Sequence, residues 1–292
     1  MATHVLSEEQ KAKFHRDGYL VLPGFLSQDE IDAMLSRTKT LLQEFDLDGH
    51  PMTKFETEAD EKHVGDQYFL ESGDKIRYFM EPDAVTGGKL NRPKDKAVNK
   101  IGHGLHELDP VFRKVTLDNP HLKQLARDLA FHKDPRVLQS MVICKQASIG
   151  GAVPPHNDST FLYTDPPSAL GFWFALEDCT PTNGALSFLP GSHLTSKVTK
   201  RFVRTLGGGT DFETLLANEP DPPTDGYIME PCPPGTLVLI HGTVAHKSER
   251  NTSDRTRFIY TFHMIEGEGA NYDEKNWLQP SANMPFSRLF AN

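Results

Sequence analysis

A histidine followed two positions later by an aspartate is the pattern in this chain that could bind a catalytic metal. On an extended segment, side chains two positions apart point to the same side, so both groups can reach one ion. A second histidine from elsewhere would complete two histidines and one carboxylate. Non-haem Fe(II) oxygenases use this ligand set, which leaves coordination positions open for chemistry. The pattern occurs three times, at His15/Asp17, His132/Asp134 and His156/Asp158.

The elements expected around the first two pairs do not direct both side chains to one side. His15/Asp17 closes a helix predicted over residues 7–17, where residues two apart do not face each other. His132/Asp134 follows a helix that an Asn-Pro N-cap opens, and a loop enforces no shared direction. Both pairs are therefore poor candidates for a metal site.

The third pair lies where the sequence changes character. From Val137 onward, short apolar or alternating runs are separated by Gly, Pro and Asn, which is typical of an antiparallel β sandwich or barrel. The runs are VLQSMVICKQ, GFWFALED, GALSFLP, GTLVLIHG and RFIYTFHMI. His156/Asp158 lies among them, after a Gly-Gly and Pro-Pro corner, and is the pair whose geometry suits a metal.

The second histidine ligand must come from further along this β region. The histidines available there are His193, His241, His246 and His263. His241 ends the run LVLI, and alternation places it on the side of Leu237 and Leu239. His246 follows a turn and the short alternating run TVAH. Spacing alone does not separate His241 from His246.

An arginine further downstream offers a group that recognises carboxylates. Arg257 begins RFIYTFHMI, on a strand that could lie beside the one carrying His246. Its guanidinium matches a carboxylate through two parallel hydrogen bonds, as a metal-bound 2-oxo acid with a second carboxylate would need. Ser248 could add a hydroxyl to the same carboxylate. Arg255 has the same side-chain parity and remains a competitor.

The chain before the β region combines helices with a long polar flank. A capping box at Ser27 predicts a helix to about Phe45. Residues 46–98 are polar, and within them YFL (68–70) and IRYFM (76–80) look like strands. A long region of mixed character is more often a functional lid or flank than a separate domain.

Two further histidines, His103 and His106, have a spacing that could share a metal on a helix. The glycines in this stretch oppose a stable helix, and no glutamate follows at the metalloprotease spacing. We therefore expect no metal site at these two residues.

Composition excludes several classes of function. The net charge of −9 opposes nucleic-acid binding, and the three cysteines form no disulfide framework or Cys-x-x-Cys motif. The beginning MATHVLSEEQ has no secretory pattern, no apolar run approaches the roughly 18 residues of a membrane span, and the end is not the peroxisomal Ser-Lys-Leu. We expect a monomeric cytoplasmic protein without nucleic-acid or membrane partners, acting on a small molecule.

Several segments together resemble the phytanoyl-CoA dioxygenase (PhyH) family of Fe(II)/2-oxoglutarate oxygenases. The resemblance covers nearly the whole chain and is carried by FHRDGYLVLPGFLS, QSMVICKQ, PPHNDSTFLYT, GFWFALEDCTPTNGALSFLPGSH, PPGTLVLIHGTVAHKS and NTSDRTRFIYTFH. The combination of NGxLxFxPGSH with a preceding His-x-Asp and a following His-x-Ser…Arg is specific. It implies a mainly β fold with flanking helices around a double-stranded β-helix core of the jelly-roll, cupin-like type.

The resemblance also implies roles for particular residues. The iron ligands would be His156, Asp158 and His246. The residues that contact the co-substrate 2-oxoglutarate would be Lys100, Met141, Trp173, Ser248 and Arg257. Because Lys100 belongs near the polar flank, we expect that flank to fold over the site. The presence of Asp158 favours hydroxylation over halogenation, since halogenating relatives carry a small residue there.

The resemblance implies one Fe(II)/2-oxoglutarate dioxygenase domain over residues 1–292. It would comprise an N-terminal helical and lid region (1–136), a core at about 137–266 and a tail (267–292). With O2, and with ascorbate as a candidate reductant, it would convert 2-oxoglutarate to succinate and CO2 and hydroxylate an unidentified small molecule.

Two other functions compete with this expectation. One is an acyl-CoA 2-hydroxylase of the phytanoyl-CoA type, which would take a CoA ester. The other is a non-catalytic β-barrel in which the metal is structural, although that function would not need an arginine fork. The residues that select the substrate are expected in the segments 46–98 and 195–226, whose conformation the sequence does not give.

Overall fold

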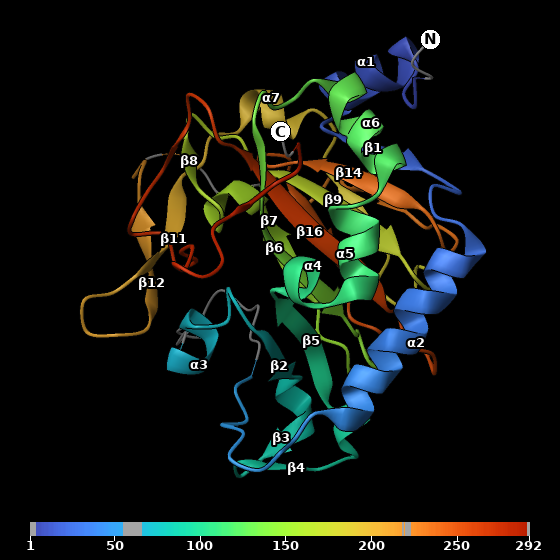
Figure 1. Ribbon diagram of the computed structural model, residues 1–292, viewed down its shortest axis with the longest axis vertical. Helices are drawn as coiled ribbons and strands as arrows, with labels where there is room; N and C mark the ends of the chain where they lie inside the picture. Colours follow the sequence, from blue (N-terminus) through green and yellow to red (C-terminus); the bar gives the residue numbers. More distant parts are fainter. Residues whose placement is uncertain (1–3, 55–65, 218, 220–222, 291–292) are drawn as a thin grey trace.

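The computed structural model describes residues 4–54, 66–217, 219 and 223–290, and two antiparallel sheets form its core (Figure 1). The larger sheet has the strand order β1-β14-β9-β16-β6-β5-β2, with β18 also paired to β6. Its strands are β1 (Tyr19–Leu22), β2 (Ile76–Met80), β5 (Val98–His103), β6 (Pro135–Ile143), β9 (Leu170–Ala175), β14 (Leu237–His241), β16 (Ile259–Glu266) and β18 (Ser287–Arg288). The smaller sheet, in the order β13-β10-β15-β7, contains β7 (Val153–His156), β10 (Leu186–Phe188), β13 (Ile228–Glu230) and β15 (His246–Ser248). This arrangement confirms the predicted jelly-roll core.

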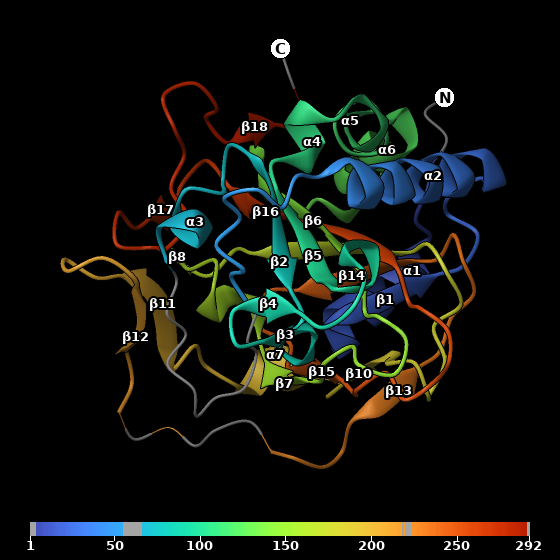
Figure 2. The same ribbon diagram turned by 90° about the horizontal axis from the view of Figure 1, so that it is seen from below.

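Alternation along the strands gives the larger sheet two buried faces. Register pairs Trp173 with Thr261, and Thr261 with Met141, so these three side chains share one face. We call this the inner face, because Trp173 packs in one cluster with Phe188 and other residues of the smaller sheet. The opposite, outer face carries Phe172, which belongs to the core cluster under the helices. Figure 2 shows the larger sheet between these helices and the smaller sheet.

Helices cover the outer face because their apolar sides pack on its aromatic residues. In α2, Ile31, Met34 and Leu41 are buried in the same cluster as Phe174. The predicted capping box at Ser27 is present. The helices are α1 (Glu8–Asp17), α2 (Gln28–Glu44), α3 (Gln67–Leu70), α4 (Leu105–Leu108), α5 (Pro110–Thr116), α6 (Pro120–Leu129), α7 (Ser192–Thr195) and the 3-10 turns η1 (Pro82–Ala84), η2 (Lys94–Lys96) and η3 (Asp158–Thr160). Among the described residues, no helix has the length and apolar character needed to cross a membrane.

One predicted strand in the polar flank is wrong. Residues 68–70 belong to the short helix α3, which the Asp66 side chain caps by accepting a hydrogen bond from the Phe69 backbone N–H. Phe69 is buried against Trp277, with ring centroids 4.4 Å apart, so tertiary packing rather than a ladder holds this aromatic run. Residues 76–80 form the predicted strand, β2. The part of the flank at 55–65 lies outside the described residues.

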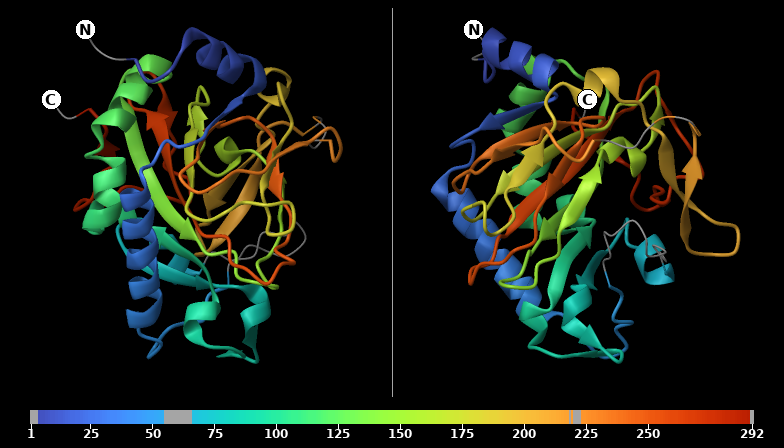
Figure 3. Two further views of the ribbon diagram at one scale, coloured as in Figure 1. Left: turned by 90° about the vertical axis from the view of Figure 1, so that its right-hand side faces the viewer. Right: turned by 180° about the vertical axis from the view of Figure 1, so that it is seen from behind.

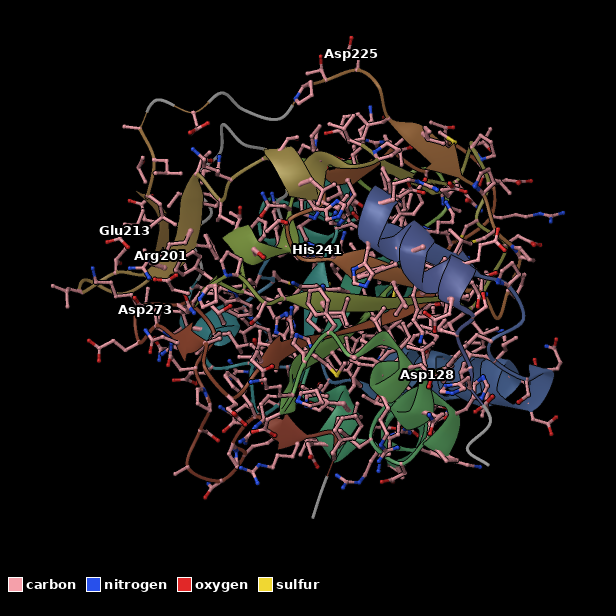
Figure 4. The ribbon with its side chains drawn as sticks, turned by 90° about the horizontal axis from the view of Figure 1, so that it is seen from above. Asp128, Arg201, Glu213, Asp225, His241 and Asp273 are labelled. Atoms are coloured by element: carbon pink, nitrogen blue, oxygen red, sulfur yellow. The ribbon has the colours of Figure 1, made fainter. Side chains whose placement is uncertain are left out.

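Three two-stranded sheets lie at the periphery: β3 (Val85–Thr86) with β4 (Lys89–Leu90), β8 (Thr164–Asp165) with β17 (Asn271–Tyr272), and β11 (Lys200–Arg204) with β12 (Thr210–Thr214). The β11–β12 hairpin stands away from the main sheets on the side of α3 (Figure 3). Arg201 forms ion pairs with Glu213 and Asp273, which join the hairpin to the C-terminal segment (Figure 4). The hairpin occupies the middle of the segment 195–226, of which residues 218 and 220–222 lie outside the described residues.

Candidate metal centre

The three predicted iron ligands meet at the inner surface of the smaller sheet. His156 ends β7, His246 begins β15, and the two are register partners. Asp158 opens η3 directly after β7. One ligand atom from each residue lies within 4.8 Å of the other two, and the described residues contain no second such group of three.

Local hydrogen bonds prepare both histidines to bind a metal. Nδ1 of His156 lies 2.9 Å from the carbonyl oxygen of Pro154, and Nδ1 of His246 lies 3.1 Å from that of Val244. A carbonyl only accepts, so each Nδ1 carries the hydrogen and each Nε2 keeps its lone pair. These Nε2 atoms lie 3.8 and 3.7 Å from Asp158 Oδ1. The donor set therefore fits a divalent cation, with the tautomer that metal binding needs.

The charges at this centre also suit a cation. Burial and then the neighbouring His246 lower the pKa of His156 to about 4, which keeps the imidazole neutral at pH 7. Burial by itself raises the pKa of the Asp158 carboxyl, but the adjacent His263 and His246 outweigh burial and hold that pKa below its usual range. The centre therefore offers neutral nitrogens and one carboxylate.

His263 of β16, one of the four histidines that could complete the ligand set, lies next to this carboxylate. Its Nε2 lies 3.2 Å from Asp158 Oδ2, so it contacts a predicted ligand from the larger sheet. Gly171 leaves room for this contact, because a Cβ there would lie 3.3 Å from both Asp158 Oδ2 and His263 Nε2. A sequence signal was available: alternation along β16 puts His263 on the side of Thr261 and Ile259.

Arg257 lies two residues before β16 and extends the inner face. Its side chain is 2% exposed, and Cζ lies 5.7 Å from the Trp173 ring centroid. Burial lowers the pKa of this guanidinium. Nε and Nη1 have no hydrogen-bond partner. Buried donors are nearly always paired, so two free N–H groups on a buried guanidinium fit a carboxylate ligand. The competitor, Arg255, is exposed.

The predicted position of Arg257 relative to His246 is wrong in one respect. Arg257 leads into β16 of the larger sheet, whereas His246 lies in β15 of the smaller sheet. The two strands are therefore not neighbours, and the two residues belong to opposite walls of the jelly roll. Local sequence could not show this, because which strands face each other depends on long-range pairing.

The other predicted co-substrate residues also belong to this interior. Register places Met141 and Trp173 in one row of the inner face, and Lys100 in the next row. The Lys100 ammonium lies over the rings of Phe69 and Phe79, at 5.4 and 5.1 Å from their centroids. Ser248 belongs to β15 of the smaller sheet and is buried. Their roles at a co-substrate remain predictions.

The competing histidine His241 lies on the outer face, away from the centre. Its ring contacts Phe14 of α1 and Phe131, and its Nδ1 lies 3.0 Å from Thr243 Oγ1. Figure 4 shows His241 beside α1. His193 lies next to His241, with ring centroids 4.8 Å apart, and so is also outside the centre.

The remaining motif candidates are engaged elsewhere. Asp17 forms ion pairs with Lys13 and Arg16, and Asp134 pairs with Arg136. His103 and His106 bond to different serines through Nδ1, to Ser72 Oγ at 2.6 Å and Ser140 Oγ at 2.8 Å. None of these residues belongs to a metal-competent group within the described chain.

Comparison with known proteins assigns these features to a family. The sequence model of phytanoyl-CoA dioxygenase (PhyH) matches residues 14–259. The chain is 46% identical over 291 residues to phytanoyl-CoA dioxygenase domain-containing protein 1 of Bos taurus, covering 98% of this chain and 99% of that protein. It is 44% identical to the homologue in Caenorhabditis elegans, covering 97% and 99%, and 40% identical to phytanoyl-CoA dioxygenase of Arabidopsis thaliana, covering 97% and 96%.

Solved structures share the fold at lower identity. The α-ketoglutarate-dependent carbocyclase SnoK from nogalamycin biosynthesis has a TM-score of 0.64 and 19% identity, with 96% of each chain covered. EctD from S. alaskensis, solved with 2-oxoglutarate and 5-hydroxyectoine, has a TM-score of 0.59 and 21% identity, with 91% and 78% covered.

Proposed function

Since this chain belongs to the phytanoyl-CoA dioxygenase (PhyH) family, we propose that it is an Fe(II)- and 2-oxoglutarate-dependent dioxygenase that hydroxylates a small molecule. The observation that carries the proposal is that two groups of side chains face the same interior of the jelly roll. These are the His156/Asp158/His246 centre and the buried Arg257 with two unpartnered donors. A structural metal would use the first group and leave the second without a purpose.

Different residues of the chain would bind the metal and the co-substrate. His156, Asp158 and His246 would hold the iron and leave coordination positions open. Iron bound with 2-oxoglutarate and O2 supplies the oxidative decarboxylation to succinate and CO2 and the oxidation of a C–H bond. Arg257 would bind the far carboxylate through a charge-assisted pair, with its guanidinium held over Trp173.

An aromatic cluster connects the metal centre to the β11–β12 hairpin. The Phe161 ring lies 5.9 Å from that of His156, and 5.7 and 6.0 Å from those of Phe202 and Phe212. These rings would exclude water beside the metal. We propose that the apolar part of the substrate lies against this cluster.

The class of oxidation is a finer proposal than the class of enzyme. SnoK is described as a carbocyclase and SnoN, a further neighbour in fold, as an epimerase. The fold therefore supports outcomes other than hydroxylation. Hydroxylation is favoured here by the carboxylate of Asp158, which halogenating relatives lack. An acyl-CoA ester remains the alternative substrate, which the family name suggests.

The test is succinate formation by the purified chain with Fe(II), 2-oxoglutarate and O2, with ascorbate as reductant. Even without substrate, we expect slow uncoupled release of succinate. Compounds that accelerate 2-oxoglutarate consumption would identify the substrate class, and acyl-CoA esters belong in that screen. Absence of both succinate release and 2-oxoglutarate binding would favour the non-catalytic metal-binding module.

A further inference from the structure

A second buried basic side chain, Lys145, lies directly opposite Arg257. The backbone N–H of Arg257 donates to the carbonyl of Lys145 at 3.1 Å, which extends the β6–β16 ladder beyond the pair Ile143/Ile259. Lys145 therefore has the same side-chain parity as Ile143 and Met141 and continues the inner face. It is 2% exposed.

The Lys145 side chain reaches the predicted carboxylate anchor by a specific path. Its Nζ lies 2.9 Å from Ser248 Oγ and also donates to the carbonyl of Glu249. A Cβ at Gly184 would lie 2.8 Å from this Nζ, and one at Gly150 would lie 2.5 Å from Lys145 Cγ. Both distances are too short for a real Cβ, so any other residue at these positions would force its neighbours to shift. Glycines therefore line the path on both sides, and Gly184 is the first of the two glycines in the NGxLxFxPGSH motif.

Two like charges opposite each other in a ladder are unfavourable unless an anion lies near both. The nearby carboxylates of the described chain form no ion pair with either side chain, and only Oε1 of Glu81 is buried without a hydrogen-bond partner. Glu177 accepts from Thr256 Oγ1 and the Phe258 N–H, Glu249 pairs with Lys247, and Glu81 accepts from the Gly151 N–H.

Neither cation has an internal counter-ion. In the described part of the chain, neither Lys145 nor Arg257 has a carboxylate oxygen within ion-pair distance. Burial, followed by the positive charge of Arg257, lowers the pKa of Lys145 to about 6, so this lysine needs a nearby anion to be fully charged at pH 7. Both observations describe a cation pair that lacks its anion.

We propose that Lys145 is a positioning residue of the co-substrate anchor, which makes the pocket selective for 2-oxo acids that carry a second carboxylate. Because an amine that donates to Ser248 Oγ occupies a lone pair of that oxygen, the Ser248 hydroxyl hydrogen is left to donate to the carboxylate bound by Arg257. Lys145 also adds a second positive charge on the same side. This inference rests on the proposed binding of 2-oxoglutarate.

The test compares two ligands that differ only in the far carboxylate, 2-oxoglutarate and 2-oxopentanoate. Their dissociation constants are measured by calorimetry on the full chain loaded with Mn(II), which avoids turnover. In Lys145→Met, we expect binding of 2-oxoglutarate to weaken about tenfold or more, as for loss of a hydrogen bond at a charged group, while binding of 2-oxopentanoate stays unchanged. A purely structural lysine would weaken both ligands equally, and that result would overturn the proposal.

Two further variants keep the test decisive. Lys145→Gln removes the charge but keeps a donor, so it should lose part of the preference and serves if the methionine variant does not fold. Lys247→Met is the matched control, because this lysine lies next to Ser248 but pairs with Glu249. It should keep the full preference.

A double variant tests whether Lys145 acts through Ser248. The losses in Lys145→Met and Ser248→Ala should not add in the double variant, and full additivity would contradict the positioning role. Failure of the wild-type chain to bind either ligand would refute the proposed function itself. Wild-type preference that survives in both Lys145 variants would refute only this inference.

Discussion

The two faces of the larger sheet are both buried and both carry histidines. They differ in whether their buried polar atoms have hydrogen-bond partners. On the outer face, Tyr260 Oη lies 2.6 Å from Thr116 Oγ1, and His106 bonds to Ser140. On the inner face, Nδ1 of His263 and two nitrogens of Arg257 have no partner. Paired polar groups stabilise a fold, whereas unpaired buried groups raise its free energy unless a ligand satisfies them. The difference indicates which face was built to bind something.

We expect the largest effect from a substitution that removes the carboxylate of Asp158, because the metal assignment on the inner face depends on it. Loss of even an outer hydrogen-bond partner of a metal ligand costs about 10–100-fold in affinity or activity, so Asp158→Ala should cost more and abolish succinate formation. Asp134→Ala is the matched control, because it alters another His-x-Asp pair whose carboxylate binds Arg136. Full activity in Asp158→Ala would contradict the metal assignment.

The next effect concerns the unpaired guanidinium. Arg257→Gln should weaken 2-oxoglutarate binding by about 2–5 kcal/mol, as for loss of one partner of a buried charge pair, and leave metal affinity nearly unchanged. The exposed Arg255 provides the control, and Arg255→Gln should change neither constant. Calorimetric titration with each ligand separates the two effects. If Arg255→Gln weakens 2-oxoglutarate binding instead, the anchor has been assigned to the wrong arginine.

A smaller effect is expected at the inner-face histidine that contacts Asp158. His263→Phe removes the group next to Asp158 Oδ2 and should weaken Mn(II) binding by about 10–100-fold. His263→Gln, which restores a donor, should recover part of that affinity. Equal losses in both variants would show that ring packing, rather than the contact with Asp158, accounts for the role of His263.

The smallest effect on function should come from the outer-face histidine. Burial and then the nearby His193 lower the pKa of His241 to about 4, against about 6.5 in an unfolded chain. Below pH 6.5 the unfolded chain binds a proton that the folded chain does not, so this residue reduces stability as pH falls towards 4.

His241→Leu should therefore flatten the dependence of unfolding free energy on pH between 6.5 and 4, by at most about 1.4 kcal/mol per pH unit. Chemical denaturation at several pH values measures it. Metal and 2-oxoglutarate binding should stay as in wild type. A loss of metal binding in this variant would break the distinction between the two faces.

Sequence pattern predicted secondary structure correctly where the interactions that stabilise an element lie between residues close in sequence. The capping box at Ser27 predicted the start of α2, because the hydrogen bonds that fix a helix start span three residues. The strand predicted at 68–70 was wrong, because this aromatic run is buried by packing of Phe69 on Trp277, more than 200 positions away.

The sequence by itself determined the His-x-Asp motif, the β character of the region after Val137 and, through family resemblance, which arginine and second histidine to choose. The tertiary structure alone decided that Arg257 and His246 belong to opposite sheets, that His263 contacts Asp158 and that Lys145 contacts Ser248. The reason is that these relations depend on register and on sheets that face each other. A strand such as LGFWFA is buried on both faces and so carries no alternation that tells the inner from the outer side.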